Sequence, residues 1–589
     1  MSRMFRSALP SILFVCSLPL VARAQGDTPP KGKVVPAIRR SLPTPLPLKF
    51  EGPSTTADIT PLDLATRLYK FADDSMMGRL AGTPWNDKGT DYIAGELKRL
   101  GLQPAGENGT YFQQVIVQSE LAEGSTLNVD GARFSPWVDF APRDQGPGAK
   151  AFDGASTIFG GTYGDTASYL PASQAEGKTV VVHVGRGKDG TPDYNIINRS
   201  QLTVRYQNAA AVAVIYMDYA PPGYVDEAFR QPTPQERGKE SGPVVPSYFY
   251  ITRKIAESVF GVSVDSLKTG MTGKPVQGHY AFEQKAAPGR NVIAVLPGSD
   301  PKLKGQYVAI GAHNDHVGFN HTPADHDSVR ALMSVAAPLG ADSPEPNVTP
   351  EQQLQIRHVL DSLRALHPSR PDSIYNGADD DGSGTVSVLE IAEAFAKSKV
   401  RPKRSLVFVW HVGEELGLFG SEYFTDHPTI PRDSIVAQLN IDMVGRGKTD
   451  DKTGLTKEGQ LINGTPGYLQ LVGSRRLSTE LGDLVEKVNV DKRLGLKFDY
   501  AIDANGHPAN IYCRSDHYEY ARYGIPIVFF TTGLHADYHQ VTDEPQYIDY
   551  DNMSKIAKLV QQSAIRVANL DHRVVVDKPK PDPKGRCAQ

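Results

Sequence analysis

The sequence predicts an α/β fold, in which a mixed, mostly parallel β-sheet lies between layers of helices and a β-rich module is inserted ahead of it. After residue 290, short apolar runs alternate with helical stretches, as in sheets whose parallel strands are covered on both faces. Between about 120 and 285, short β-rich runs are separated by turns rich in Gly, Pro and Asp. The composition, with 40% hydrophobic and 22% charged residues, is that of a soluble globular protein.

The first 24 residues have the pattern of a secretory signal peptide. Arg3 and Arg6 precede the apolar run 12–21, and residues 22–24 (Ala-Arg-Ala) supply a small-x-small cleavage pattern. The alternative is a membrane anchor, but a span needs ~20 apolar residues. We therefore expect a protein that is secreted or periplasmic after cleavage of the signal peptide. The Pro-rich stretch up to residue 55 is predicted to be a flexible leader.

The remaining segments differ in periodicity and composition. Apolar residues recur at helical spacing over 61–102, and Gly101 is a plausible C-cap. The predicted segments are an N-terminal part of the main domain (56–120), the β-rich insert (121–285), the α/β main domain (286–572) and a flexible tail (573–589).

One stretch, 319–375, interrupts the α/β rhythm of the main domain. It contains an amphipathic helix candidate, whose apolar residues are Leu354, Ile356, Val359, Leu360 and Leu363. The stretch is either a surface excursion or a lid beside a functional site. Both interpretations are compatible with the sequence.

Charge and cysteine content narrow the functional classes. The formal net charge is −4, and removal of residues 1–24, which hold three Arg and no acidic residue, leaves −7. Such a surface argues against nucleic acid or an anionic membrane as a partner. Cys16 leaves with the signal peptide, so that Cys513 and Cys587 could form one disulfide in an oxidising compartment. The sequence does not establish that these two residues pair.

Acidic and His residues follow four predicted strands. His313 and Asp315 follow the strand candidate 307–311, and Glu414 and Glu415 follow the candidate 405–410. Asp442 follows the candidate 436–441, and Tyr538 and His539 follow the candidate 527–531. An Asp-rich run, 376–384, lies between the first two strands. Because parallel strands end at one edge of the sheet, we expect these side chains to converge there.

Two His and several carboxylates are ligands suited to zinc. Five protein ligands are too many for one open tetrahedral site. They suit two metal ions ~3.5–4 Å apart that share a carboxylate.

Five sequence blocks carry a resemblance to a known family. They are 311–315 (GAHND), 377–381 (GADDD), 414–421 (EELGLFGS), 441–443 (IDM) and 537–539 (DYH). Together they resemble the co-catalytic dizinc aminopeptidases, which include secreted bacterial leucyl aminopeptidases and glutamate carboxypeptidase II. The resemblance implies a zinc exopeptidase fold over about 290–570, and 78–83 (GRLAGT) is similar to the family's N-terminal part. The β-rich insert resembles a protease-associated domain.

The resemblance implies a role for each residue. Two Zn²⁺ ions would be held, one by His313 and Asp442 and the other by Glu415 and His539, with Asp380 bridging them. Glu414 would be the general base that acts on a metal-activated water. Asp315 would bond the second ring nitrogen of His313. Tyr538 would donate to the developing oxyanion, or simply pack beside a ligand.

The long loop after Asp315 departs from the family pattern. His316, His321 and His326 lie in or near this loop, and we do not expect them to be ligands because five positions are already filled. The predicted activity is removal of N-terminal residues from peptides or proteins. The alternatives are a carboxypeptidase, a glutaminyl cyclase, or a non-catalytic receptor-like protein. Arg446 and Arg514 are the nearest basic residues that a carboxypeptidase could use.

Overall fold

A computed structural model describes residues 41–116, 118–143, 151–165, 167–185, 199–219, 233–234, 245–284, 289–344, 346–585 and 587–589. The predicted signal peptide, and the leader as far as residue 40, lie outside these ranges. No helix in the described part of the chain combines the length and the apolar character that a membrane crossing requires.

Two helices form the N-terminal part of the main domain, within the range predicted to be helical. α1 (Pro61–Phe71) and α2 (Pro84–Leu100) both begin with Pro, after a Thr whose side chain caps the first turn. Gly101 ends α2 with φ 73°, the left-handed conformation expected of a glycine C-cap. The 3₁₀ segment η1 (Asp74–Arg79) separates the two helices.

The β-rich insert has a sheet and hydrophobic clusters of its own. The eight strands lie in the order β5-β4-β12-β7-β8-β9-β11-β6, and β7, β8, β9 and β11 run parallel. Two clusters of buried residues form within the insert, and α3 (Arg199–Arg205) and α4 (Arg253–Phe260) accompany the sheet. The strands are β4 (Thr126–Val129), β5 (Ala132–Phe134), β6 (Phe140–Arg143), β7 (Ala155–Tyr163), β8 (Thr179–Val184), β9 (Ala211–Ile215), β11 (Ser247–Ile251) and β12 (Thr272–His279). A separate three-stranded sheet joins β3 (Gln118–Leu121) with β10 (Thr233–Pro234) and β13 (Phe282–Gln284). The identification of the insert as a protease-associated domain stays a prediction.

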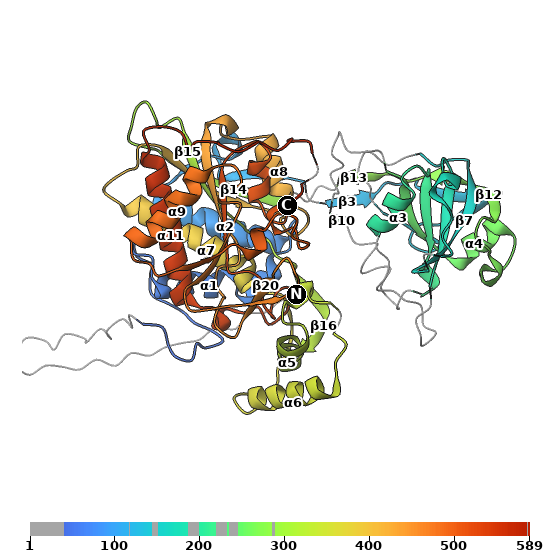
Figure 1. Ribbon diagram of the computed structural model, residues 1–589, viewed down its shortest axis with the longest axis horizontal. Coiled ribbons are helices and arrows are strands. Elements are labelled where there is room, and N and C mark those ends of the chain that lie inside the picture. The colour runs from blue at the N-terminus through green and yellow to red at the C-terminus, as the bar shows by residue number, and fades with distance from the viewer. Residues whose placement is uncertain are drawn as a thin grey trace, which may run out of the picture. The chain divides into compact units, whose positions relative to one another are not determined.

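The main domain contains a nine-stranded mixed sheet, which confirms the predicted fold class. Two of its strands, β14 and β15, are labelled among the helices of the main domain in Figure 1. Its four central strands, in the order β18-β15-β19-β24, are all parallel to one another. β14 pairs antiparallel with β18, and β22 pairs antiparallel with β24, so the sheet is mixed towards both edges. The strands are β1 (Gln103–Pro104), β2 (Phe112–Val115), β14 (Gly289–Leu296), β15 (Tyr307–His313), β18 (Ser405–His411), β19 (Ile435–Ile441), β22 (Tyr468–Val472), β23 (Lys497–Asp499) and β24 (Ile527–Thr531).

Helices pack against both faces of this sheet. On one face, α1, α2, α7 (Gly384–Lys397), α9 (Thr479–Asp491) and α11 (Tyr550–Asn569) share a cluster of buried residues with the strands. On the other face, α8 (Phe419–Asp426) and α10 (His517–Ala521) contribute to a second cluster. The hairpin of β20 (Lys452–Leu455) and β21 (Leu461–Asn463) stands apart from the large sheet.

The 319–375 segment has its own secondary structure. β16 (Phe319–Asp325) pairs with β17 (Pro371–Ile374), and the connection contains α5 (His326–Ala336) and α6 (Pro350–Arg364). The amphipathic helix predicted here corresponds to α6. None of its residues is buried, and Leu354 is 63% exposed.

The described ends of the chain contact the main domain. Thr55, in the segment predicted to be a leader, donates to Glu393 on α7 at 2.7 Å. Cys513 and Cys587 form a disulfide, and the backbone N–H of Gln589 donates to Asn510. The predicted segment boundaries themselves remain predictions.

Candidate metal centre

The five predicted metal ligands lie together beyond the carboxyl ends of the central strands. His313 is the last residue of β15, Asp442 directly follows β19, and Glu415 follows β18. Asp380 lies just before α7, and His539 lies in the loop after β24. Parallel pairing of these strands brings residues that are far apart in sequence to one edge of the sheet.

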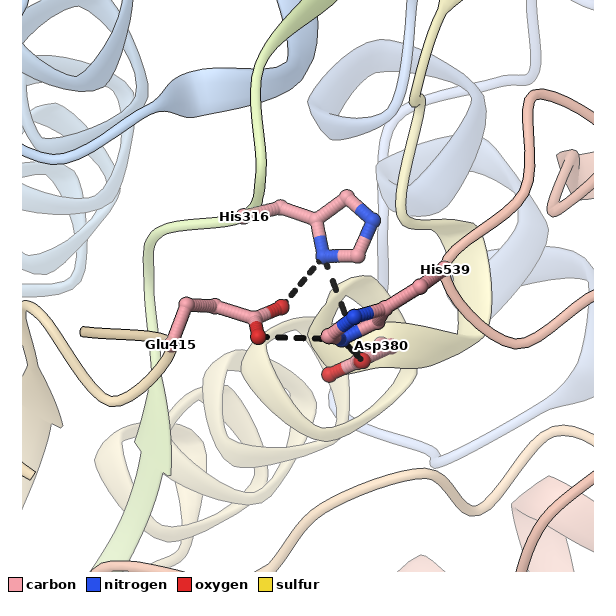
Figure 2. Close-up of side chains that lie close together, drawn as sticks. All are labelled: His316, Asp380, Glu415 and His539. Carbon is pink, nitrogen blue, oxygen red and sulfur yellow. Dashed lines mark hydrogen bonds and ion pairs between the residues drawn. The ribbon is translucent and has the colours of Figure 1, made fainter. Parts of the chain in front are cut away.

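The side chains form two groups that share Asp380. Oδ1 of Asp380 lies 3.1 Å from Nε2 of His313, and Oδ1 of Asp442 lies 3.6 Å from the same nitrogen. Oδ2 of Asp380 lies 2.9 Å from Nε2 of His539, which is also 2.9 Å from Oε2 of Glu415 (Figure 2). Within each group, one candidate ligand atom per residue lies within 4.8 Å of the others. One oxygen of Asp380 therefore faces each group.

The candidate ligand atoms of both groups are suited to bind metal ions. Nε2 of His313, Nε2 of His539 and Oδ1 of Asp442 are buried, and none forms a well-aligned hydrogen bond with a residue that the structure describes, although carboxylate oxygens lie 3.1 and 2.9 Å from the two nitrogens. Such unpaired buried polar atoms are costly unless something else satisfies them. Imidazole nitrogens and carboxylate oxygens are ligands that zinc accepts.

The electrostatics of the site also favour a cation. Burial raises the pKa of Glu414 well above its ordinary value, and the neighbouring carboxylates of Asp442 and Glu415 raise it further. Burial alone would lower the pKa of His313, but the carboxylates of Asp442 and Glu414 raise it well above 6.5. Both shifts reflect an excess of buried negative charge, which a bound cation would offset.

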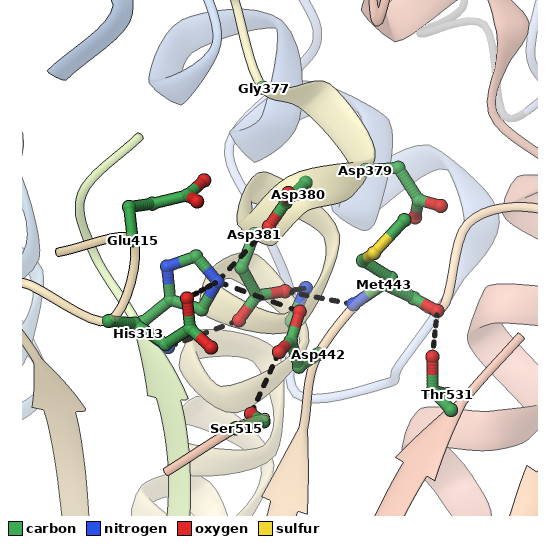
Figure 3. Close-up of polar contacts among 12 residues, drawn as sticks. His313, Gly377, Asp379, Asp380, Asp381, Glu415, Asp442, Met443, Ser515 and Thr531 are labelled. Atoms are coloured by element: carbon green, nitrogen blue, oxygen red, sulfur yellow. Dashed lines mark hydrogen bonds and ion pairs between the residues drawn. The ribbon is translucent and has the colours of Figure 1, made fainter. Parts of the chain in front are cut away.

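Asp381 holds together the segments that carry the candidate ligands. Its carboxylate accepts hydrogen bonds from three backbone N–H groups, those of His313, Gly384 and Met443, at 3.1, 2.8 and 3.2 Å (Figure 3). These residues belong to the end of β15, the start of α7 and the segment after β19. Sequence reasoning assigned no role to Asp381, because a run of three Asp does not indicate which carboxylate faces the backbone.

Asp315 contacts His313 differently from the expectation. Nδ1 of His313 lies 3.2 Å from the backbone carbonyl oxygen of Asp315, whereas the Asp315 carboxylate is 3.8 Å away. That carboxylate instead accepts from the backbone N–H of Glu414 at 3.4 Å. The carbonyl still fixes the ring, because Nδ1 donates to it and leaves Nε2 free to face Asp380.

A cavity of about 330 Å³ lies beside the two groups. Glu414 and Tyr538 line it, and so do the apolar side chains of Leu418, Met443, Leu455, Ile502, Ile511 and Phe529. Oε2 of Glu414 is 4.0 Å from Nε2 of His313. The hydroxyl of Tyr538 accepts from Arg514 at 3.4 Å.

The two basic residues singled out in the sequence are both paired. Arg446 is buried and bonds Asp537 at 2.8 Å and Asp543 at 3.2 Å. Arg514 lines the cavity and pairs with Asp342, a residue of the 319–375 segment. Sequence reasoning missed this partner, because 172 residues separate it from Arg514.

The three additional His residues have different surroundings. His316 lies in the group of Asp380, Glu415 and His539. His326 is buried and contacts Glu544 at 2.9 Å, away from both groups. The side chain of His321 lies outside the described part of the structure.

Comparison with known proteins identifies relatives of the main domain. The sequence profile of peptidase family M28 matches residues 291–564. Leupeptin-inactivating enzyme 1 of Streptomyces exfoliatus is 29% identical over 30% of this chain and 34% of its own length. A probable leucine aminopeptidase 1 of Trichophyton verrucosum (strain HKI 0517) is 27% identical over 41% of this chain and 58% of its own. The chain thus spans between about one third and three fifths of these two relatives. Among solved structures, a zinc aminopeptidase from Bacillus subtilis aligns over 87% of this chain and 96% of its own, with 15% identity and a TM-score of 0.46.

Proposed function

From the match of residues 291–564 to peptidase family M28, we propose that the protein is an exported, zinc-dependent exopeptidase that releases N-terminal residues from peptides. The relatives named leucine aminopeptidase support the choice of an aminopeptidase. One observation carries the proposal: Asp380 directs one carboxylate oxygen to His313 and the other to His539.

In this proposal His313 and Asp442 would hold one Zn²⁺, Glu415 and His539 would hold a second, and Asp380 would contribute to both. Bound there, the ions would polarise the scissile carbonyl and lower the pKa of a water molecule. The buried Nε2 atoms of the two His residues support this assignment, because they face carboxylate oxygens without a well-aligned hydrogen bond.

Glu414 is proposed to act as the general base. Its carboxylate lines the cavity and is close to the His313 group without being part of it. It would take the proton of the attacking water and pass it to the leaving amine.

The charges around the cavity favour recognition of a substrate amine over a carboxylate. Asp380, Glu414, Glu415 and Asp442 all line the cavity, and Arg514 is the only Arg or Lys among the described residues that do so. The proposed ions would offset much of the charge of Asp380, Glu415 and Asp442, so that the argument depends mainly on Glu414 and on the shortage of basic residues. Because Asp342 already pairs with Arg514, a substrate carboxylate would have to displace that partner. The carboxypeptidase alternative is therefore disfavoured, and Tyr538 remains a candidate donor to the oxyanion.

Digestion of a defined peptide mixture, with and without N-acetylation, tests the activity. Mass spectrometry should show stepwise loss of N-terminal residues from the free peptides, especially apolar residues, and resistance of the acetylated ones. Loss of C-terminal residues from both forms would establish a carboxypeptidase instead. Cyclisation of N-terminal Gln without peptide cleavage would establish a glutaminyl cyclase. No turnover by protein that carries zinc would support the receptor-like alternative.

Elemental analysis of protein purified without chelator tests the cofactor. We expect two zinc ions per chain, and loss of activity when a chelator removes them. A metal content near zero, with activity unaffected by chelation, would contradict the proposal.

Export is proposed from the signal pattern in residues 1–24. The disulfide between Cys513 and Cys587 supports it, because such bonds persist mainly in oxidising compartments. N-terminal sequencing of protein recovered from the periplasm or the medium should begin near Gln25. Soluble cytoplasmic protein that still begins at Met1 would contradict export.

A further inference from the structure

His316 contacts one of the proposed ligands at hydrogen-bond distance. Its Nδ1 lies 2.6 Å from Oε1 of Glu415 and 4.0 Å from Oδ2 of Asp380 (Figure 2). The other oxygen of Glu415, Oε2, faces His539. His316 therefore contacts the oxygen of Glu415 that is turned away from His539.

The surroundings of the ring indicate which nitrogen carries the proton. Nε2 of His316 is buried and has no hydrogen-bond partner among the described residues. If His316 bound a metal through Nδ1, its proton would be on Nε2, where a buried donor would be left unpaired. With the proton on Nδ1, the ring donates to a carboxylate, a strong charge-assisted hydrogen bond, and the unpaired Nε2 is an acceptor and not a donor. The geometry thus favours a donor over a ligand.

The backbone around His316 fixes the ring in this position. The N–H of His316 donates to the carbonyl of Arg79 at 3.3 Å, and the guanidinium of Arg79 donates to the carbonyl of Gly377 at 3.0 Å. Gly377 has φ 55°, and a Cβ on it would lie 2.6 Å from Cγ of the His316 ring. Arg79, in the GRLAGT block, therefore joins the His316 segment to the turn that leads to Asp380.

We propose that His316 is a positioning residue for Glu415: its Nδ1–H holds Oε1, and so turns Oε2 towards His539 and the metal that this pair would bind. This role rests on the proposed zinc-dependent function. Carboxylate ligands are oriented by such outer hydrogen bonds, and loss of one typically costs 10–100-fold in metal affinity.

Two substitutions separate a donor from a ligand. In His316→Asn, the side-chain amide nitrogen occupies nearly the place of Nδ1 and still donates, but an amide nitrogen is not a metal ligand. His316→Leu removes the donor and keeps an apolar side chain in the buried site. His358→Asn, at an exposed position on α6, is the matched control.

Competition with a chromophoric chelator, on purified holoenzymes, measures the zinc content and the affinity for each of the two ions. Thermal unfolding of the metal-free proteins shows whether each variant folds. We expect His316→Asn and His358→Asn to stay within about threefold of wild type. His316→Leu should bind one ion 10–100-fold more weakly and the other nearly normally.

The outcomes distinguish this role from the proposed function. If His316→Asn loses the ion as His316→Leu does, His316 is a ligand and the positioning role is wrong. If both variants keep wild-type affinity, His316 has no part in binding. If the wild-type protein itself binds no metal, the proposed function fails and this role fails with it. If the His316→Leu protein does not fold, the comparison of His316→Asn with wild type still decides whether His316 is a donor or a ligand.

Discussion

The hydroxyl of Ser515 donates a 2.8 Å hydrogen bond to Oδ2 of Asp442, and Oδ1 of the same carboxylate faces His313 (Figure 3). The Ser515 oxygen in turn accepts from the side-chain amide of Asn440 at 3.0 Å. This chain of contacts orients the Asp442 carboxylate towards Nε2 of His313. Ser515 lies in a loop far from β19 in the sequence, so its part in the site depends on the fold.

Ser515→Ala should weaken metal binding at the His313–Asp442 group. Without the hydroxyl, Oδ2 of Asp442 loses the partner that fixes the carboxylate, and about tenfold lower affinity for one ion is expected. Chelator competition measures the affinity. Ser362→Ala, at an exposed position on α6, should bind like wild type. Equal affinities for all three proteins would show that Ser515 does not orient Asp442.

Substitution of the adjacent residues Glu414 and Glu415 should have different effects. Glu414→Gln should retain two zinc ions and the native fold, and should lose ~10²–10⁴-fold in kcat because the base is absent. Glu415→Gln should instead lower the zinc content. Steady-state kinetics and elemental analysis on the same preparations check both. Wild-type turnover by Glu414→Gln would remove Glu414 from the mechanism.

Arg330, on α5, should stabilise the loop that carries Tyr538 and His539. Its guanidinium donates to both oxygens of Asp537 at 2.8 Å and lies 3.6 Å from the Tyr547 ring centroid. Arg330→Met should lower the free energy of unfolding by about 1–2 kcal/mol, because Asp537 is buried and keeps only part of its hydrogen-bond network.

Urea denaturation of metal-free protein measures this change. Arg357→Met, in the same segment but exposed on α6, is the control and should change stability by less than about 0.5 kcal/mol. If the two variants are equally stable, the contact between α5 and the loop contributes nothing, and the 319–375 segment is a surface excursion at this point.

Glu544 should contribute to stability in a pH-dependent way. Burial alone would raise its pKa, but contacts with His326 and Arg370 lower it below the ordinary value of 4.5. A carboxyl whose folded-state pKa is lowered stabilises the fold above its unfolded pKa, and this contribution is lost as the pH falls through the folded-state pKa. Glu544→Gln should therefore be less stable than wild type at pH 7, and the difference should shrink as the pH falls below 4.5.

Thermal unfolding of metal-free wild type and Glu544→Gln between pH 7 and pH 3 tests this. Metal-free protein is used so that loss of zinc does not add to the pH dependence. Glu351→Gln, exposed on α6, should follow the wild-type curve. A difference that stays constant down to pH 3 would mean that ionisation of Glu544 does not stabilise the fold.

The fold and the candidate site were predictable from the sequence to different extents. The four parallel strands and the residues that follow them were evident, because apolar runs ending in Asp, Glu or His recur along the chain. The antiparallel direction of β14 could not be predicted, because an apolar run has the same pattern whichever way the strand runs. Gly101 was identifiable as a cap, since its helix has a clear apolar period.

Contacts between distant segments could not be read from the sequence. Counting ligands led to the prediction that His316 is not a ligand, but a count does not reveal which side chains hydrogen-bond to a ligand. The pairing of Asp342 with Arg514 and of Arg330 with Asp537 joins the 319–375 segment to the site, and both pairs depend on how α5 and its neighbours pack. The helical period of α6 was correct, yet the period did not reveal that the helix has no buried residue.

The sharing of Asp380 has a thermodynamic consequence for the proposed pair of ions. Because one carboxylate belongs to both groups, the two proposed binding equilibria would be linked, and each ion would change the affinity for the other by the same factor. The first ion to bind fixes the Asp380 side chain, which favours the second, while its positive charge opposes the second. The shape of a zinc titration would show the balance of these two effects. That balance would set the range of zinc concentrations over which a singly loaded protein exists.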